Sequence, residues 1–234
     1  MGGTATYLKK RSELETYFDR TAADAWAKLT SDAPVSGIRA TVRAGRDAMR
    51  DTLLSWLPDD MTGLTLLDAG CGAGQLAIEA ARRGADVIAV DLSKTLVQLA
   101  RERACEMPMK GTIAFHVGDA FDPSLGQVDH VIAMDSVIHY GADDIADILA
   151  GFTARARRSV AFTFAPRTPA LTAMHAAGKL FPKSDRSPAI QPVSEAGLRR
   201  RLTTHPDLWG WSARRTQRVK SGFYISQAME LTAP

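Results

Sequence analysis

Cysteine is scarce in this sequence. Only Cys71 and Cys105 occur among 234 residues, which excludes a disulfide framework and favours a reducing compartment. Long apolar runs are missing too, since no stretch approaches the roughly 18 apolar residues of a membrane span. Residues 1–20 contain no apolar segment of the kind a secretory signal needs. We therefore expect a cytoplasmic protein without a transmembrane segment.

Charge of one sign is in small excess, but it is unevenly placed. The net charge is +3, and residues 199–220 contain one acidic residue, Asp207, among seven basic ones. These basic residues are Arg199, Arg200, Arg201, Arg214, Arg215, Arg218 and Lys220. Such a stretch is either a solvated face or an attraction for an anionic substrate, a partner protein or a membrane surface, so peripheral membrane association stays open. No nucleic-acid partner is expected, because no aromatic-interleaved basic motif accompanies the charge.

Strand and helix patterns alternate through the middle of the chain. Short apolar runs predict buried strands at 64–68, 86–90, 111–117, 128–134 and 159–164. Helical spacing predicts helices at 75–83, 94–107 and 143–157. This order predicts an α/β fold with a Rossmann-like, doubly wound and mostly parallel sheet. Residues 211–219 and 222–230 are expected to form an antiparallel pair at the sheet edge.

The flanking segments suggest how the chain is divided. Helical spacing over 38–57 stops at Pro58, so residues 1–58 are interpreted as an N-terminal helical arm. Residues 59–234 then form the core domain. Between about 166 and 192 the sequence becomes apolar and proline-bracketed. We interpret this part as a lid, inserted after the fifth strand, that covers the substrate.

A glycine-rich motif carries the strongest functional signal. Residues 68–74 read D-A-G-C-G-A-G, directly after a predicted strand and before a predicted helix. Glycines let the backbone turn sharply and approach a ligand, and the helix N-terminus offers free N–H groups. The spacing G-x-G-x-G, with Gln at position 75, differs from the dinucleotide fingerprint G-x-G-x-x-G. It resembles motif I of class I S-adenosylmethionine methyltransferases, which implies cofactor contacts by Asp68, Gly70, Cys71, Gly72 and Gly74.

Acidic residues follow the next two predicted strands. Asp91, with Leu92 beside it, stands about 20 residues after the first glycine, where a carboxylate accepts hydrogen bonds from ribose hydroxyls. Asp119 and Ala120 follow the third strand, and the resemblance to class I methyltransferases implies that they contact adenine.

Three further cofactor contacts are expected toward the methionine end of the cofactor. Met134 and Asp135 follow the fourth strand, where loops at the carboxyl ends of parallel strands meet. Arg43, on the helix before the core, is expected to pair with the methionine carboxylate. The loop 134–140 lacks an N-P-P-Y-type signature, which counts against methylation of nucleic-acid bases. His139 lies on this loop and is a candidate for a functional role.

With these residues in place, nearly the whole chain resembles the magnesium-protoporphyrin IX O-methyltransferase family of chlorophyll and bacteriochlorophyll biosynthesis. The resemblance rests on Tyr17-Phe18 and on residues 38–45, 67–74, 135–140 and 222–224. It implies S-adenosylmethionine as cofactor and Mg-protoporphyrin IX as substrate, with one propionate converted to its methyl ester. It also implies the large porphyrin-binding subunit of magnesium chelatase as a partner that hands over the substrate.

The chemistry of the implied substrate limits what the enzyme has to do. A propionate has a pKa near that of Glu, about 4.3, and is already ionised at neutral pH, so no strong base is needed. His139 and Tyr17 are the catalytic candidates. We expect His139 to orient the substrate, by axial contact to its magnesium or by a hydrogen bond to the propionate, and Tyr17 to close over the site. The protein itself is expected to hold no metal.

Other functions stay open at this point. A different small-molecule methyltransferase, acting on a quinone ring or an amine, would share the motif and the fold. A nucleotide-binding oxidoreductase or a non-catalytic domain of the same fold is the third alternative. The acceptor assay separates the first two, and binding of S-adenosylhomocysteine rather than NADH separates both from the third.

Overall fold

The computed structural model describes residues 9–14, 17, 37–168 and 189–234. These residues contain one seven-stranded sheet with the strand order β3-β2-β1-β4-β5-β7-β6. The strands are β1 (Thr65–Ala69), β2 (Asp86–Asp91), β3 (Thr112–Val117), β4 (Val128–Ala133), β5 (Ala156–Phe164), β6 (Ser212–Ser221) and β7 (Tyr224–Thr232). Strands β1 to β5 are parallel, and β7 is antiparallel to both β5 and β6. The predicted doubly wound, mostly parallel sheet is confirmed, with β3 and β6 as its two edge strands.

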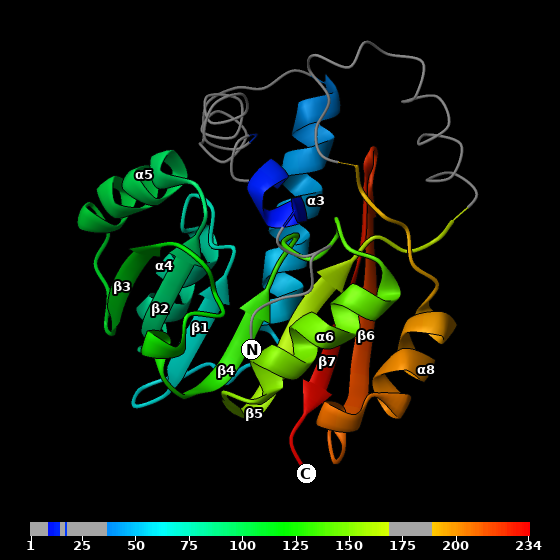
Figure 1. Ribbon diagram of the computed structural model, residues 1–234. Coiled ribbons are helices and arrows are strands. Elements are labelled where there is room, and N and C mark those ends of the chain that lie inside the picture. Colours follow the sequence, from blue (N-terminus) through cyan, green and yellow to red (C-terminus); the bar gives the residue numbers. More distant parts are fainter. Residues whose placement is uncertain (1–8, 15–16, 18–36, 169–188) are drawn as a thin grey trace.

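Helices cover both faces of this sheet. They are α3 (Gly37–Leu54), α4 (Gln75–Arg82), α5 (Lys94–Cys105), α6 (Ala142–Thr153) and α8 (Glu195–Thr204), with 3₁₀ turns η1 (Pro123–Leu125) and η3 (Pro206–Leu208). In Figure 1, α6 and α8 lie on one face, and α3 and α4 on the other. Successive strand side chains point to opposite faces. Accordingly Leu67 joins the apolar cluster under α6, and Leu66 joins the cluster under α3 and α4.

The structure ends several helices earlier than predicted: α3 ends at Leu54 rather than at 57, and α5 at Cys105 rather than at 107. A third change is larger. The predicted helix 143–157 ends at Thr153, and β5 already begins at Ala156. Strand pairing explains the difference, because Ala156 pairs with Val128 of the parallel neighbour β4. The spacing of apolar residues within the helix carries no information about pairing with a residue 28 positions earlier.

The predicted lid lies almost entirely outside the described residues, but both of its ends are described. The Arg167 N–H donates to the Val193 carbonyl at 2.9 Å, and the Val193 N–H donates to the Ala165 carbonyl at 2.9 Å. These bonds form an isolated bridge that joins residues 166 and 193. The division into an arm of residues 1–58 and a core of residues 59–234 stays a prediction, although α3 confirms the expected helix before the core.

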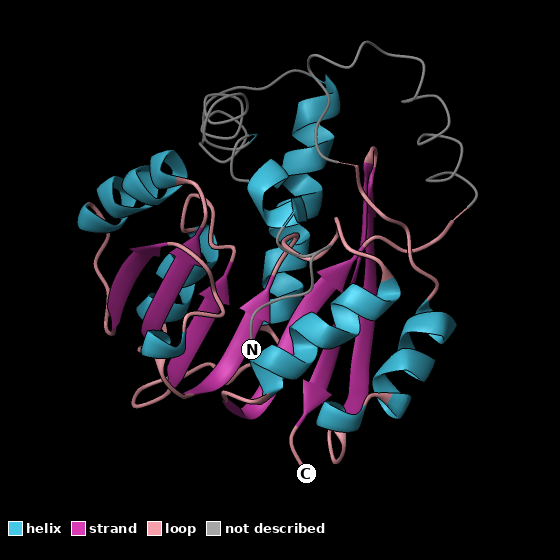
Figure 2. Ribbon diagram, in the orientation of Figure 1, coloured by secondary structure: helices cyan, strands magenta, loops and turns pink. Residues whose placement is uncertain are grey.

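The parallel strands all end at one edge of the sheet. Figure 2 shows the arrowheads of β1, β4 and β5 pointing toward this edge and that of β7 pointing away from it. The loops that follow β1, β2, β3 and β4 therefore gather there, and they carry the motifs found in the sequence. No helix in the described part of the chain is long and apolar enough to cross a lipid bilayer.

Candidate functional site

The glycine loop after β1 is fixed to the end of β2. The N–H groups of Gly70 and Cys71 both donate to the Val90 carbonyl, at 2.8 and 3.0 Å. Gly70, Gly72 and Gly74 have φ angles of 86°, 51° and 78°, in the left-handed region that glycine adopts without a steric penalty. The loop thus takes a conformation that side chains at these positions would strain.

The three glycines differ in what surrounds them. A Cβ at Gly70 would lie 2.6 Å from the Cβ of Ser136, and one at Gly74 would lie 2.8 Å from the Cβ of Ala100. A Cβ at Gly72 would meet no atom within 4 Å. Gly70 and Gly74 therefore allow close packing inside the protein, while Gly72 borders open space on the side where a ligand can approach.

Two carboxyl groups flank this loop. Asp68, at 1% exposure, accepts a hydrogen bond from the Ala77 N–H in the first turn of α4. Burial, reinforced by the nearby charge of Asp91, raises the pKa of Asp68 to about 7. Its Oδ2 has no hydrogen-bond partner in the described part of the chain. A buried acceptor of this kind is costly unless something pairs with it.

Asp91 holds the glycine loop from the other side. Its Oδ2 accepts from the Gly72 N–H at 2.8 Å and its Oδ1 from the Ser93 N–H at 2.9 Å. Burial raises the pKa of this carboxyl group. A carboxylate offers about four lone-pair positions. The Leu92 N–H also donates to it, so Asp91 fixes the loop with three backbone bonds and retains about one acceptor position for a ligand hydroxyl.

Asp119, after β3, is paired with the N-terminal segment. Its Oδ1 accepts from the Phe121 N–H at 2.9 Å, and its Oδ2 lies 3.1 Å from Nη1 of Arg11. Arg11 belongs to the helical residues 9–14, and Leu14 of that segment is buried in the apolar cluster under α6. The arm therefore reaches the loop after β3. The sequence analysis missed Arg11, because nothing in the local pattern links it to position 119.

Most of the remaining predicted cofactor contacts are apolar side chains that lie at the same edge of the sheet. Leu92 and Ala120 are half-buried against the cluster under α6, and Met134 is half-buried against the cluster under α3 and α4. Cys71 is a buried free thiol whose pKa is raised by burial. A protonated thiol is a poor nucleophile, so Cys71 contributes packing rather than covalent chemistry.

Asp135, after β4, is held by side chains from several elements. Its φ is 53°, and it is the one described non-glycine residue with a positive φ. Nη1 of Arg46 on α3 lies 2.6 Å from its Oδ2, and the Tyr224 hydroxyl at the start of β7 donates to the same carboxylate at 3.1 Å. The Asp135 N–H donates to the Thr163 hydroxyl of β5 at 2.7 Å. The loop after β4 is thereby joined to α3, β5 and β7.

This arrangement refines the sequence analysis of α3. The predicted cofactor contact was Arg43, whereas the arginine that reaches Asp135 is Arg46, three residues later on the same helix. The role of Arg43 toward a cofactor stays a prediction. Burial and the charge of Asp135 raise the pKa of Tyr224, so its hydroxyl remains a donor. The segment 222–224 was noticed in the sequence, but its contact with Asp135 was not.

His139 is buried, with 4% of its surface exposed. Its Nδ1 lies 3.4 Å from the Ala189 carbonyl oxygen, which can only accept. A hydrogen bond there places a proton on Nδ1. The next residues are tied to the same segment, because the Gln191 N–H donates to the Ile138 carbonyl at 2.8 Å. Tyr17 is half-buried, and its approach to the site stays a prediction.

Taken together, these loops can bind a nucleoside. The Asp91 carboxylate lies against the glycine loop, Gly72 borders open space, and the N-terminus of α4 follows directly. The neutral Cys71 thiol offers no nucleophile. The arrangement suits positioning of two reactants more than acid–base or covalent catalysis.

Comparison with known proteins agrees with this geometry. Residues 133–233 match the family described as Magnesium-protoporphyrin IX methyltransferase C-terminus, and residues 66–158 match a methyltransferase domain. The chain is 48% identical to the magnesium-protoporphyrin O-methyltransferase of Rhodobacter capsulatus, over 96% of this chain and 97% of that protein. The magnesium-protoporphyrin O-methyltransferase of Synechocystis is 30% identical over 97% of this chain and 98% of that protein.

Solved structures give the same picture. The crystal structure of magnesium protoporphyrin IX methyltransferase from Synechocystis with bound S-adenosylhomocysteine superimposes with a TM-score of 0.83 at 30% identity, covering 96% of this chain and 100% of that chain. A cyclopropane synthase from Mycobacterium tuberculosis has a TM-score of 0.70 at 16% identity, covering 96% of this chain and 98% of that chain, and shares the fold.

Proposed function

Because this chain belongs to the magnesium-protoporphyrin O-methyltransferase family, we propose that it methylates a propionate carboxylate of Mg-protoporphyrin IX with S-adenosylmethionine as methyl donor. The product is the monomethyl ester. The observation that carries this proposal is the 48% identity to the Rhodobacter capsulatus enzyme over almost the full length of both chains. The G-x-G-x-G loop and the carboxylates at the strand ends supply the chemistry the donor requires.

Different described residues are proposed to contact different parts of the cofactor. Asp91 accepts hydrogen bonds from the ribose hydroxyls while it holds Gly72 in place. Asp119 and Ala120 face the adenine, and Met134 and Asp135 lie under the sulfonium end. Asp68 stabilises the first turn of α4 and contributes an acceptor without a described partner. These assignments rest on the position of each residue at the carboxyl edge of the sheet.

The methyl transfer is a single displacement. A carboxylate oxygen forms a bond to the methyl carbon while the bond from that carbon to sulfur breaks, and sulfur keeps the electron pair. No proton moves, because the propionate enters ionised. The protein has to align oxygen, carbon and sulfur and exclude water from the nucleophile.

His139 is proposed to orient the porphyrin. Its ring is held near the Ala189 carbonyl at the loop after β4. From there it is proposed to contact the magnesium of the substrate axially or to hydrogen-bond the propionate. Tyr17 is proposed to close over the site from the arm.

The decisive experiment is product analysis with pH-dependent kinetics. The wild type should convert Mg-protoporphyrin IX to its monomethyl ester, and a quinone or an amine acceptor should give no methylated product. A His139→Ala variant should lose kcat/KM at all pH values from about 6.5 to 9 if His139 orients the substrate. A wild-type rise in rate near pH 6.5 that is flattened in His139→Ala would instead make His139 a general base.

The basic stretch of residues 199–220 is proposed to dock the porphyrin-binding subunit of magnesium chelatase. The structure narrows this surface, because Arg199 pairs with Glu195, Arg201 with Asp143 and Arg215 with Glu230. Exposed basic side chains that pair with no carboxylate among the described residues remain at 200, 214, 218 and 220. Association should weaken with salt, since exposed charges are screened within about 10 Å at 0.1 M. Salt-independent association would exclude this surface.

The same surface bears on where the protein resides. We propose a cytoplasmic location with peripheral contact to anionic membranes through the exposed basic side chains. Cosedimentation with vesicles that contain an anionic lipid tests the contact. Binding that disappears in neutral vesicles is expected, and no binding to either kind would refute it.

A further inference from the structure

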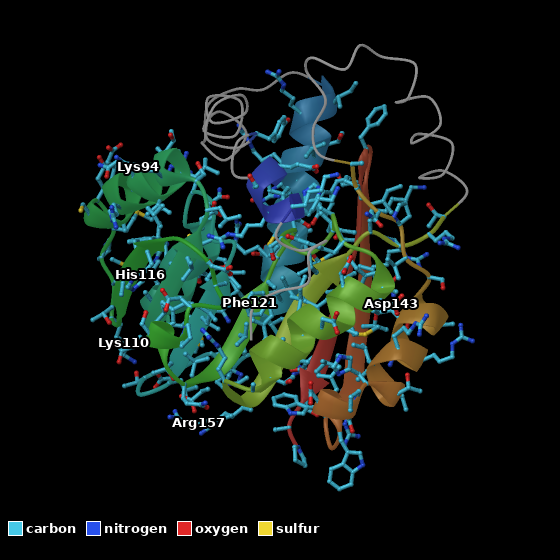
Figure 3. All side chains as sticks on the ribbon, in the orientation of Figure 1. Lys94, Lys110, His116, Phe121, Asp143 and Arg157 are labelled. Carbon is cyan, nitrogen blue, oxygen red and sulfur yellow. The ribbon has the colours of Figure 1, made fainter. Side chains whose placement is uncertain are left out.

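A polar cleft lies where the N-termini of α6 and α8 come together. Its volume is about 250 Å³, and its walls include Gly141, Arg167, Gln191, Ser194, Arg200 and Arg201. Asp143, which also borders it, is labelled in Figure 3 beside α8. No role for this cleft follows from the cofactor motifs, which lie at the ends of β1 to β4.

The cleft carries a positive charge excess. Of its three arginines, Arg201 is neutralised by Asp143, with Nε 2.8 Å from the carboxylate. Arg167 and Arg200 are exposed and form no ion pair with a carboxylate among the described residues. The two helix N-termini add their positive dipole ends, and the N-cap of α6 is a glycine without a capping side chain. The cleft is therefore built to receive an anion.

Its size restricts the kind of anion. Pockets that enclose a whole small molecule have volumes of about 300–1,000 Å³. A cleft of about 250 Å³ admits an end group rather than a macrocycle. Arginine guanidinium groups match the planar geometry of a carboxylate and bind it through paired hydrogen bonds. A carboxylate at the end of a short flexible chain fits both the volume and the charge.

The cleft shares a wall with the His139 loop. The segment 189–193 lines the cleft through Gln191 and Val193. On this same segment the Gln191 N–H donates to the Ile138 carbonyl at 2.8 Å, and the Ala189 carbonyl lies 3.4 Å from Nδ1 of His139. The segment 189–193 therefore separates a ligand group in the cleft from His139, the side chain proposed to orient the substrate.

We propose that this cleft binds the second propionate of the porphyrin, the one that is not methylated, through Arg167 and Arg200. This inference rests on the proposed function. Protoporphyrin IX carries two propionates on neighbouring pyrrole rings, so both project from the same edge of the macrocycle. When one is aligned with the sulfonium methyl group, the other stays ionised and lies outside the reaction centre, where a cationic cleft can pair with it. Holding it there fixes which of the two carboxylates reacts.

The test compares two substrates in two proteins. The substrates are Mg-protoporphyrin IX, called the diacid below, and a derivative called the monoamide. In the monoamide the propionate that does not react is converted to a neutral amide. The proteins are the wild type and the double variant Arg167→Ala/Arg200→Ala. Arg157→Ala is the matched control, because Arg157 is an exposed arginine near the opposite end of β5, as Figure 3 shows.

With the diacid, the double variant should raise KM about tenfold or more, the effect of losing a hydrogen bond to a charged group. Its kcat and its affinity for S-adenosylhomocysteine should stay within about twofold of the wild type, as should all three quantities in Arg157→Ala. The wild type should lose a similar factor with the monoamide. In the double variant KM should be the same for the diacid and the monoamide, because the two arginines that would bind the charged propionate have been removed.

Three outcomes would decide against the proposal. An equal KM of the wild type for diacid and monoamide would overturn the cleft assignment and leave the proposed function standing. So would a monoamide penalty of the same size in the wild type and in the double variant. Failure of the wild type to form a methyl ester from either porphyrin would overturn the proposed function itself, and the cleft assignment with it.

Discussion

Replacing Arg46 by methionine isolates the contact that joins α3 to the loop after β4. Methionine keeps most of the apolar stem and removes the guanidinium group, whose Nη1 lies 2.6 Å from Oδ2 of Asp135. The side chains are 20% and 8% exposed, so the pair is largely buried. Removing one partner of a buried pair costs about 3–5 kcal/mol.

The expected loss is smaller than that, because Asp135 keeps other donors. The hydroxyls of Tyr224 and Ser226 still reach its carboxylate, at 3.1 and 3.4 Å. We therefore expect Arg46→Met to lower the free energy of unfolding by about 2–3 kcal/mol. With a urea dependence of about 2–3 kcal/mol per M, the unfolding midpoint should fall by about 1 M.

A double-mutant cycle with Asp135→Asn measures the pair directly. Asparagine tolerates the left-handed backbone at this position, so the change removes charge without adding strain. The coupling between the two changes should be about 1.5–2 kcal/mol. Arg50→Met on the same helix is the control, because Arg50 pairs with the more exposed Asp47 and should cost under about 1 kcal/mol. A coupling below about 0.5 kcal/mol would refute the reasoning.

Three further predictions concern the cofactor loop. Asp91→Ala should weaken S-adenosylhomocysteine binding by about 1–3 kcal/mol in calorimetry, and an unchanged affinity in the folded variant would remove the ribose assignment. Gly72→Val should abolish binding with a modest loss of stability, whereas Gly70→Val should also destabilise the fold, because its side chain would meet Ser136; normal binding by folded Gly72→Val would mean that this is not the cofactor loop. Asp68 is protonated more readily in the folded state, with a pKa of about 7 against the usual 3.8, so stability should fall as pH rises from about 4 to 7 and level off above it. Urea titrations of Asp68→Asn across this range should show a flatter profile, and an unchanged slope would contradict the buried-acid assignment.

The location of most of the predicted site residues at one edge of the sheet was predictable, because each of these lies at or closely after the end of a strand. The glycine loop, Asp91 and Asp119 each directly follow an apolar run, and a parallel doubly wound sheet places such positions at one edge. The distance of each residue from the preceding strand was therefore enough to predict that it lies at this edge. The antiparallel pair after residue 211 was predictable in the same way, from two runs separated by a turn.

The contacts that escaped prediction join distant segments. Arg46 and Tyr224 each lie 89 positions from Asp135, and Arg11 reaches Asp119 from the N-terminal arm. No periodicity distinguishes Arg46 from Arg43, since both belong to one helix and only the packing of α3 against β6 and β7 decides which arginine reaches the loop. The same limit applies to the end of α6, which strand pairing sets.

The bridge between residues 166 and 193 gives this protein a modular organisation. Its backbone hydrogen bonds bring the two ends of the intervening chain together. The pairing of β5 with β7 does not involve the residues between these ends. Lengthening a closed loop costs little free energy, about 0.6 kcal/mol for each doubling. A change in the length of the chain between the two anchors should therefore leave the pairing of β5 with β7 in place.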